Sequence, residues 1–337
     1  MPQIIVEPLP EPFRALMQDL PVTGLAIAVI NGDFIRISAC CEFLGEMLTE
    51  DTIWPVASLT KPVFVYGILQ LVQRGLIELD RPLQEYLPRP YLENIPELPL
   101  ITARHTMTHS TGFPNWRDAQ GLRTSFRPGE KFSYSSEGLN YLQAVAEHLV
   151  GMPMSEYLKQ NVFLPFGMTQ TKLGYETAET VPPFASFLLN TFPANSAFSL
   201  RTTIGDYARF VQAMFEPNVG GEYRLSETML KEMLRPQIDV GERPGLHWGL
   251  GWGLHTSPTD MSFWHWGARS IPTAMNFAVG WPEQKQGMVI FTNHNQGLQL
   301  ADDIIRNAFM FLSSPVFAFD WLLPAKNWRP DGSRPDQ

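Results

Sequence analysis

The chain lacks the features that mark several common protein classes. Its 337 residues include only two cysteines, Cys40 and Cys41. Adjacent cysteines rarely meet the geometry of a disulfide bond, so we expect no disulfide framework. Lys and Arg number 25 against 34 Asp and Glu, without a basic stripe, which argues against nucleic acid as a partner. No apolar run approaches the ~20 residues of a membrane-spanning helix.

Several catalytic and ligand-binding motifs are also missing. The sequence contains no G-x-S-x-G, which excludes the nucleophile turn of α/β-hydrolases. It contains no H-E-x-x-H, so we interpret His105 and His109 as structural residues and not as a metal pair. The glycine-rich stretch 249–253 lacks the spacing of a phosphate-binding loop and is interpreted as a strand. We therefore expect no metal and no cofactor.

The N-terminal residues carry no sign of an export signal. The stretch from Met1 to Arg14 contains Glu7 and Glu11, no early basic cluster and no apolar segment of roughly 7–15 residues. We therefore expect a soluble, cytoplasmic protein. A secreted or periplasmic location stays open if a leader has been removed from the chain.

Strand-like segments lie near both ends of the chain, and helical segments lie between them. Asn31-Gly32 between two apolar runs predicts a hairpin, because this pair favours a tight two-residue turn. Short apolar runs bounded by turn residues predict strands over Leu25–Ile30, Phe34–Ile37, Phe263–Trp266, Ala274–Trp281 and Gly287–Thr292. Apolar residues at helical spacing predict helices over 62–75, 138–150, 204–215, 227–234 and 302–312.

This grouping of strands and helices predicts an α+β fold. We expect an antiparallel sheet built from the N- and C-terminal segments, flanked by helices, with an inserted, mostly helical lobe. The expected organisation is an N-terminal extension over 1–20, a single domain over 21–312 and a C-terminal tail over 313–337. Inside the domain, the sheet lobe takes about 21–60 and 240–312, and the helical lobe about 61–239.

The first motif with chemical meaning is Ser58-Leu59-Thr60-Lys61, at the start of a predicted helix. Residues three apart share a helix face, so the hydroxyl and the amine can meet. A serine becomes a good nucleophile when a neighbour takes its proton, and a lysine with a lowered pKa can do so. The N–H of Ser58 would also point toward a developing oxyanion. Taken alone, the tetrad favours a helix-capping serine and a solvated lysine.

The second motif is Tyr134-Ser135-Ser136, just before a predicted helix. A tyrosine can shuttle protons if cationic neighbours stabilise its phenolate. Alone, the same residues suit a buried aromatic ring followed by helix-capping serines.

The third motif is His265-Trp266-Gly267 on a late strand. A strand edge can supply a backbone N–H to an oxyanion, and Gly267 allows close approach of a substrate. His265 offers a proton donor or a positive charge near neutral pH. Alone, it is better explained as a core histidine of an aromatic strand.

Together and in this order, the three motifs resemble the serine β-lactamase and penicillin-binding-protein-like family. The closest likeness is to its class C branch, which includes D-amino-acid peptidases and family VIII esterases. The likeness extends over roughly residues 20–312 and includes the flanking stretches Gly75–Pro88, Ile101–Pro114 and Phe163–Thr169.

The resemblance implies a role for each motif residue. Ser58 is the expected acylated nucleophile, and Lys61 is its proton acceptor. Tyr134 is expected to relay protons to the leaving group and later to help activate the deacylating water. His265 is expected to orient a substrate carboxylate and to tune the phenol. The backbone N–H groups of Ser58 and Ala268 are expected to form the oxyanion hole.

Two departures from the family pattern bear on the substrate. Ser136 stands where the family usually has an asparagine that holds a substrate carbonyl, and a hydroxyl is shorter and offers one donor. Trp266 replaces a small residue and either narrows the cleft or provides a stacking wall. Both changes favour an esterase or a small-amide or D-peptide hydrolase over a true β-lactamase.

Other functions stay open at this point. The alternative within the class is a β-lactamase or a penicillin-binding D,D-peptidase. The alternative from another class is a binding or sensor protein that is acylated without turnover. The expected partner is a small-molecule ester, amide or β-lactam-like substrate. Transfer of the acyl group to an acceptor other than water also stays open, as does the oligomeric state.

Overall fold

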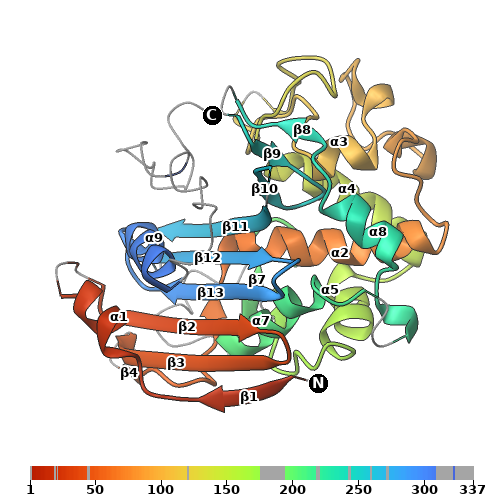
Figure 1. Cartoon of the computed structure of the whole chain (residues 1–337). Helices are drawn as coiled ribbons and strands as arrows, with labels where there is room; N and C mark the ends of the chain where they lie inside the picture. Colours follow the sequence, from red (N-terminus) through yellow and green to blue (C-terminus); the bar gives the residue numbers. More distant parts are fainter. Residues whose placement is uncertain are drawn as a thin grey trace.

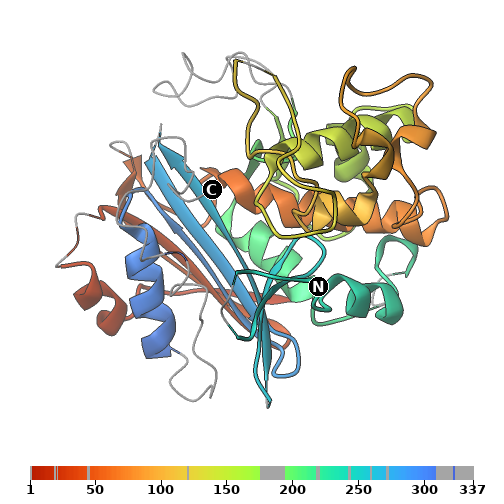
Figure 2. The ribbon, with the colours of Figure 1, turned by 90° about the horizontal axis from the view of Figure 1, so that it is seen from above.

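The computed structural model describes most of the chain. The described residues are 2–18, 20, 22–43, 46–119, 121–174, 194–217, 221–241, 244–258, 260–270, 273–308 and 322. Within them, a large sheet carries helices on both faces (Figures 1 and 2). The predicted α+β class is confirmed.

The central sheet is built from both ends of the described chain. Its strand order is β1-β3-β2-β13-β12-β11-β10-β9-β8, and β4 pairs with β3. Every neighbouring pair is antiparallel except β1 with β3, which is parallel. The strand bounds are β1 (Gln3–Val6), β2 (Gly24–Asn31), β3 (Phe34–Phe43), β4 (Glu46–Met47), β8 (Ile238–Asp239), β9 (Leu246–Trp248), β10 (Gly253–Thr256), β11 (Met261–Ser270), β12 (Thr273–Trp281) and β13 (Gln286–Thr292).

The predicted strands and hairpins are present. In the β2–β3 hairpin, Asn31 pairs with Phe34, and Gly32 takes the left-handed φ of 56° that such a tight turn needs. Residues 282–285 connect β12 to β13, which begins at Gln286. Cys40 and Cys41 lie inside β3.

Residues 3–6, within the stretch expected to form an N-terminal extension, contribute a strand to the sheet. Gln3–Val6 pairs in parallel with residues 34–37 of β3 and forms an edge of the sheet. This short run of β-branched residues fits a strand, but four residues are too few for a clear periodic signal. Helix α1 (Glu11–Leu16) contacts α9 (Gly297–Ala308) beneath the sheet. The predicted domain boundaries stay predictions.

In the glycine-rich stretch 249–253, residues 249–252 form a turn and only Gly253 belongs to a strand, so the strand interpretation was wrong for most of the stretch. It connects β9 to β10, and Gly251 has a φ of 79°, which few other residues adopt. A Cβ at Gly251 would lie 2.8 Å from Val65. The Gly251 N–H donates to Met107 O at 2.9 Å, so the turn packs tightly into the helical lobe.

The helical lobe covers one face of the sheet, and α9 and α1 cover the other (Figure 2). The predicted helices are present within a few residues, except that α9 begins earlier than expected, and residues 309–312 lie outside the described residues. The helices of the lobe are α2 (Thr60–Gln73), α3 (Ala103–Met107), α4 (Ser136–Val150), α5 (Met154–Leu158), α7 (Ile204–Ala213) and α8 (Glu227–Met233). Short helical turns are η1 (Ala57–Leu59), η2 (Leu83–Tyr86), η3 (Leu98–Leu100), η4 (Lys159–Phe163) and η6 (Gly221–Tyr223), and a small sheet contains β5 (Trp54–Pro55), β7 (Leu200–Thr202) and β6 (Lys172–Leu173).

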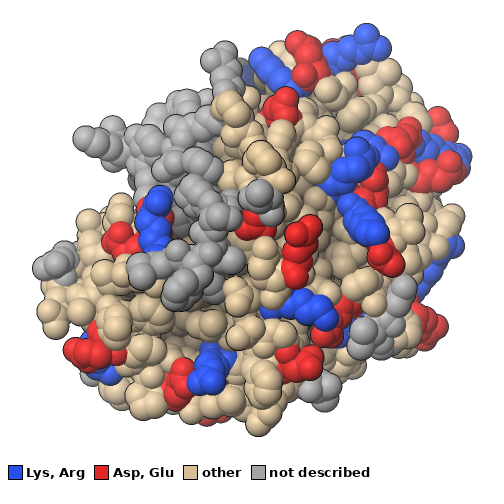
Figure 3. All heavy atoms as spheres, viewed as in Figure 1, with Lys and Arg blue, Asp and Glu red and all other residues tan. Residues whose placement is uncertain are grey.

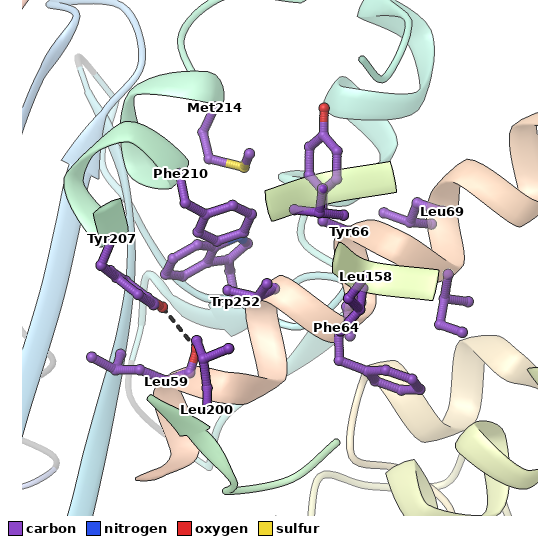
Figure 4. Packing of buried hydrophobic residues seen from close by; sticks show 14 of the residues in the cluster. Leu59, Phe64, Tyr66, Leu69, Leu158, Leu200, Tyr207, Phe210, Met214 and Trp252 are labelled. Carbon is purple, nitrogen blue, oxygen red and sulfur yellow. Dashed lines mark hydrogen bonds between the residues drawn. The ribbon is translucent and has the colours of Figure 1, made fainter. Parts of the chain in front are cut away.

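Helix α2 is the buried axis of the lobe. Every residue from Thr60 to Leu71 is buried, as expected of a helix that is largely apolar around its circumference. Figure 4 shows Phe64 and Tyr66 among aromatic and aliphatic side chains from the surrounding elements. Tyr207 Oη donates a hydrogen bond to Leu59 O at 2.9 Å, which ties the turn before α2 to α7. The N-terminal end of α2 is therefore held rigidly.

The outer surface fits the acidic composition. On the face seen in Figure 3, Lys and Arg side chains are interspersed with Asp and Glu, and neither sign forms a continuous patch there. Among the described helices, none is long and apolar enough to cross a membrane. The expected cellular compartment stays a prediction.

Candidate active site

Ser58 lies on a tight turn at the buried end of α2. The preceding residue, Ala57, has a φ of 49°, a conformation that costs free energy for any residue except glycine. Thr60 Oγ1 donates to Ala57 O at 2.6 Å and accepts from Leu200 N at 2.9 Å. These contacts hold the turn in place and leave Ser58 only partly buried at its apex.

Lys61 contacts Ser58, as the spacing predicts. Its Nζ donates to Ser58 Oγ at 2.9 Å and to Ala197 O at 2.8 Å. Lys61 is fully buried, and burial lowers the pKa of its amine well below the usual range. Since burial favours the neutral amine, Lys61 is suited to accept the Ser58 proton.

Tyr134 lies beside this pair. Its ring centroid is 4.9 Å from Lys61 Nζ, and its buried hydroxyl lies beside Ser58. Burial raises the pKa of the Tyr134 phenol well above its usual range, and nearby Ser58 lowers it only in part. The phenol is therefore protonated and can act as a proton donor.

His265 also belongs to this cluster, but it carries no charge. It is fully buried on β11, and its ring centroid lies 6.2 Å from that of Tyr134. Burial and the neighbouring Lys61 amine lower the pKa of His265 to about 3. Nδ1 lies 2.7 Å from Trp266 O, and only a protonated Nδ1 can bond to a carbonyl. Of the two roles expected of His265, a proton donor or a positive charge, the lowered pKa disfavours the charge at neutral pH, and Nε2 then holds a lone pair.

Gly267 lets β11 approach the turn that carries Ser58. A Cβ at Gly267 would overlap Val56 O and would lie 3.2 Å from Leu59 N. At Gly267 the missing side chain thus allows one backbone segment to approach another, and the expected approach of substrate there stays a prediction. Ala268 follows directly and is partly buried, so β11 passes the turn as the predicted oxyanion hole requires. The hole itself stays a prediction.

Trp266 and Ser136 lie next to Tyr134 and are both buried. The Trp266 ring centroid is 5.0 Å from that of Tyr134, which favours the interpretation of Trp266 as a wall that packs against the phenol ring. Ser136 is the first residue of α4, and its Oγ donates to Asn115 Oδ1 at 2.9 Å. Its one hydroxyl donor is therefore already used.

Comparison with known proteins identifies the family. A family model described as Beta-lactamase matches residues 11–310. The chain belongs to this Beta-lactamase family.

Two curated relatives illustrate the range of the Beta-lactamase family. Esterase EstB of Burkholderia gladioli is 32% identical over 200 residues, which cover 49% of this chain and 50% of EstB. Penicillin-binding protein 4* of Bacillus subtilis (strain 168) is 22% identical over 336 residues, which cover 85% of this chain and 69% of that protein. The match thus spans half the length of EstB.

Two solved structures share the fold of this family member. The penicillin-binding protein from Bacillus halodurans has a TM-score of 0.74 and 20% identity, and the match covers 88% of this chain and 100% of that one. The D-amino acid amidase from Ochrobactrum anthropi SV3 has a TM-score of 0.69 and 21% identity, covering 88% of this chain and 99% of that one.

The site of this Beta-lactamase family member includes residues that the sequence analysis missed. His109 was considered only as a partner of His105, but its ring centroid lies 4.3 Å from that of Tyr134. Its Nδ1 is 3.1 Å from both the nitrogen and the oxygen of the Ser135 backbone, which fixes the tyrosine segment. Burial, then Lys61 and His265, lower the pKa of His109 well below its usual range. Tertiary packing brings His109 beside the second motif, and the spacing of the motifs in the sequence does not reveal this contact.

His105 has a separate structural role. Its Nδ1 accepts from Thr102 N at 3.3 Å, and Thr102 Oγ1 accepts from His105 N, which together cap α3. Among the described residues, no group of three or more His, Cys, Asp or Glu side chains is arranged to hold a metal ion.

Proposed function

We propose that the protein forms an acyl-enzyme on Ser58 and hydrolyses small esters or amides, including D-peptides. The observation that carries this proposal is the 2.9 Å contact between Ser58 Oγ and the Nζ of a fully buried Lys61. A nucleophile paired with a base of lowered pKa is the arrangement that covalent catalysis requires.

The mechanism starts with attack of Ser58 Oγ on the substrate carbonyl. Its proton passes to Lys61, and the N–H groups of Ser58 and Ala268 bind the oxyanion. Tyr134 gives its proton to the leaving group and regains one from the Lys61 ammonium. That ammonium forms 4.9 Å from the phenol ring and stabilises the transient phenolate. In the second half, water loses a proton to the same pair and its oxygen bonds to the acyl carbon. The bond to Ser58 Oγ then breaks, the proton returns to Oγ, and the acid is released.

Two features favour neutral esters and amides over substrates with a carboxylate. His265 is neutral, so it offers no charge to an anionic group. The Ser136 hydroxyl already donates to Asn115 Oδ1, so it offers no donor to a substrate carbonyl. A β-lactamase or D,D-peptidase activity is the alternative within the same mechanism.

The decisive experiment compares Ser58→Ala with the parent on p-nitrophenyl acetate. We expect Ser58→Ala to lose Ser58-dependent turnover, and an acylating probe to leave a mass adduct on the parent only. Ser155→Ala, on α5, is the matched control because it removes a serine hydroxyl away from the site. Equal hydrolysis by Ser58→Ala and the parent would disprove the proposal.

A substrate panel separates the alternatives. Nitrocefin, D-alanyl peptides and esters of graded chain length are compared by the number of turnovers per active site. Multiple turnovers on esters or amides support the enzyme. A single stoichiometric burst on every substrate would instead indicate a binding or sensor protein.

A further inference from the structure

We propose that Asn195 is a positioning residue for Lys61, because it fixes the turn whose Ala197 carbonyl bonds to the Lys61 amine. Asn195 acts through the orientation of this carbonyl and not as a catalytic residue. The inference rests on the proposed acyl-enzyme at Ser58. It adds a residue that determines how readily Lys61 takes the proton of Ser58.

The turn at residues 195–199 is closed by Asn195. Its Oδ1 accepts from the Ala197 N–H at 2.8 Å, the bond by which an asparagine side chain stabilises a turn two residues on. The Asn195 carbonyl accepts from the Phe198 N–H at 3.5 Å and from Ser199 Oγ at 2.9 Å. The peptide units on both sides of Ala197 are therefore tied to Asn195. Because a trans peptide is planar, the Ala197 carbonyl points away from the Phe198 N–H, and it accepts from Lys61 Nζ at 2.8 Å.

Helix α4 anchors the Asn195 side chain. A backbone N–H can only donate, so Oδ1 faces Ala197 and Nδ2 faces the other way. Nδ2 donates to Asn140 Oδ1 at 2.9 Å. Asn140 also bonds to the Glu137 carboxylate, which can only accept and so takes the NH2 group of Asn140. Donors and acceptors thus agree from α4 to the Ala197 backbone, and they fix the orientation of both carboxamides.

A second residue of α4 holds the start of the same turn. Gln143 Nε2 donates to Ala194 O at 3.0 Å, and its Oε1 accepts from Ser196 N at 2.8 Å. Asn140 and Gln143 are three positions apart and share a face of the helix. Because the second motif leads directly into α4, one helix positions both Tyr134 and the carbonyl that bonds to Lys61.

The Ala197 carbonyl stabilises the protonated form of Lys61. When the Ser58 O–H bond breaks and an N–H bond forms on Nζ, the buried ammonium needs acceptors. Those recorded among the described residues are Ser58 Oγ and Ala197 O. Burial lowers the pKa of the amine, and a hydrogen bond that favours the charged form opposes this. The turn therefore keeps Lys61 basic enough to accept the proton.

Three other titratable side chains face Lys61. Tyr134 lies beside it, His109 follows α3, and His265 comes from β11. Burial keeps the phenol protonated, and burial together with Lys61 keeps both imidazoles neutral at neutral pH. A substitution at Asn195 leaves these groups in place. A change in the pKa of Lys61 can therefore be assigned to the turn.

The test measures kcat/KM of the parent and Asn195→Ala on p-nitrophenyl acetate as a function of pH. Product is followed at the isosbestic wavelength of p-nitrophenol, so that the signal does not depend on pH. We expect the acid limb of the variant to move to lower pH by about half to one pH unit, because the ammonium loses stabilisation. The plateau should fall about three- to tenfold, because the base is weaker. A purely structural loss would lower the plateau without moving the limb.

Two further variants control the comparison. Ser196→Ala removes a bond from the same turn to Leu139 O, 3.2 Å long, and leaves the Asn195 contacts in place. Its acid limb is expected to match that of the parent. Asn195→Ser keeps a shorter acceptor for the Ala197 N–H, so its limb should lie between those of the parent and Asn195→Ala. Thermal unfolding checks that each variant folds.

An unmoved limb in Asn195→Ala, or an equal shift in Ser196→Ala, would overturn the inference. If Asn195→Ala does not fold, Asn195→Ser is compared with the parent alone, and an unmoved limb there has the same meaning. These results leave the proposed function intact. Its failure would show separately, as a parent that hydrolyses the ester no faster than Ser58→Ala.

Discussion

At the scale of single residues, the site depends on burial of groups that ordinarily carry charge. Lys61, His109 and His265 are each buried, and each has a lowered pKa for that reason first. Buried amines and imidazoles favour their neutral forms. Within the described residues, no carboxylate is recorded as a partner of Lys61, so burial makes this amine a base.

The first residue-scale prediction concerns Lys61. Lys61→Arg keeps a long cationic side chain, but guanidinium does not give up its proton in proteins, so it cannot accept one from Ser58. We expect kcat to fall by about 10²–10⁴. The measurement is ester turnover at saturating substrate, with circular dichroism as the control for folding. Retention of full activity would rule out Lys61 as the base.

The pH dependence follows from the same residues. Activity needs neutral Lys61, so kcat/KM is expected to fall as pH drops through the lowered pKa of this amine. Because the pKa of His265 is about 3, His265→Gln should not create or remove a limb near pH 6.5. A pH profile of both proteins checks this. Loss of a limb near pH 6.5 in His265→Gln would show that the imidazole titrates there.

Stability should respond to acid for a related reason. The folded pKa of His265 lies below the usual value of 6.5, so the unfolded chain binds the proton more readily. Its contribution is present above pH 6.5 and is lost as pH falls from 6.5 toward 3. We expect the urea midpoint to drop less in His265→Gln than in the parent between pH 7 and pH 5. An identical drop in both would contradict this.

At the scale of elements, the close fit of β11 against η1 is the main constraint. Gly267→Ala would place a methyl group against the Val56 carbonyl, where backbone on both sides limits relaxation. We expect about 1–3 kcal/mol less stability together with a loss of ester turnover. Gly205→Ala in α7 is the control, because its added Cβ meets the flexible end of Ile37 at 3.0 Å. Denaturant titration and turnover measure both effects.

Sequence reasoning succeeded where a local pattern determines the element. The Asn31-Gly32 turn and the contact between Ser58 and Lys61 both follow from short-range geometry. The turn at Gly251 was misread because alternating glycines resemble a strand until their φ values and their packing on α2 are known. His109 was missed for the same kind of reason, since its partner Ser135 is 26 positions away.

At the scale of the whole molecule, β1 forms one edge of the sheet and lies several strands away from β11. In the strand order, β3, β2, β13 and β12 separate the two. A chain beginning at Glu11 should therefore keep Ser58-dependent turnover but unfold at a lower temperature. Its exposed β3 edge should also promote association. Calorimetry, light scattering and an ester assay test this, and loss of turnover in a folded monomer would contradict it.

The strands that surround the Ser58 turn are synthesised long after Ser58 itself. Ser58 emerges early from the ribosome, but β11, β12 and β13, which connect its turn to β2, belong to residues 261–292. The nascent helical lobe thus carries the nucleophile without the strands that complete its surroundings. Chains that terminate before residue 261 should therefore not be acylated on Ser58. Acylation should appear only after β13, the last strand of the described chain, has been synthesised.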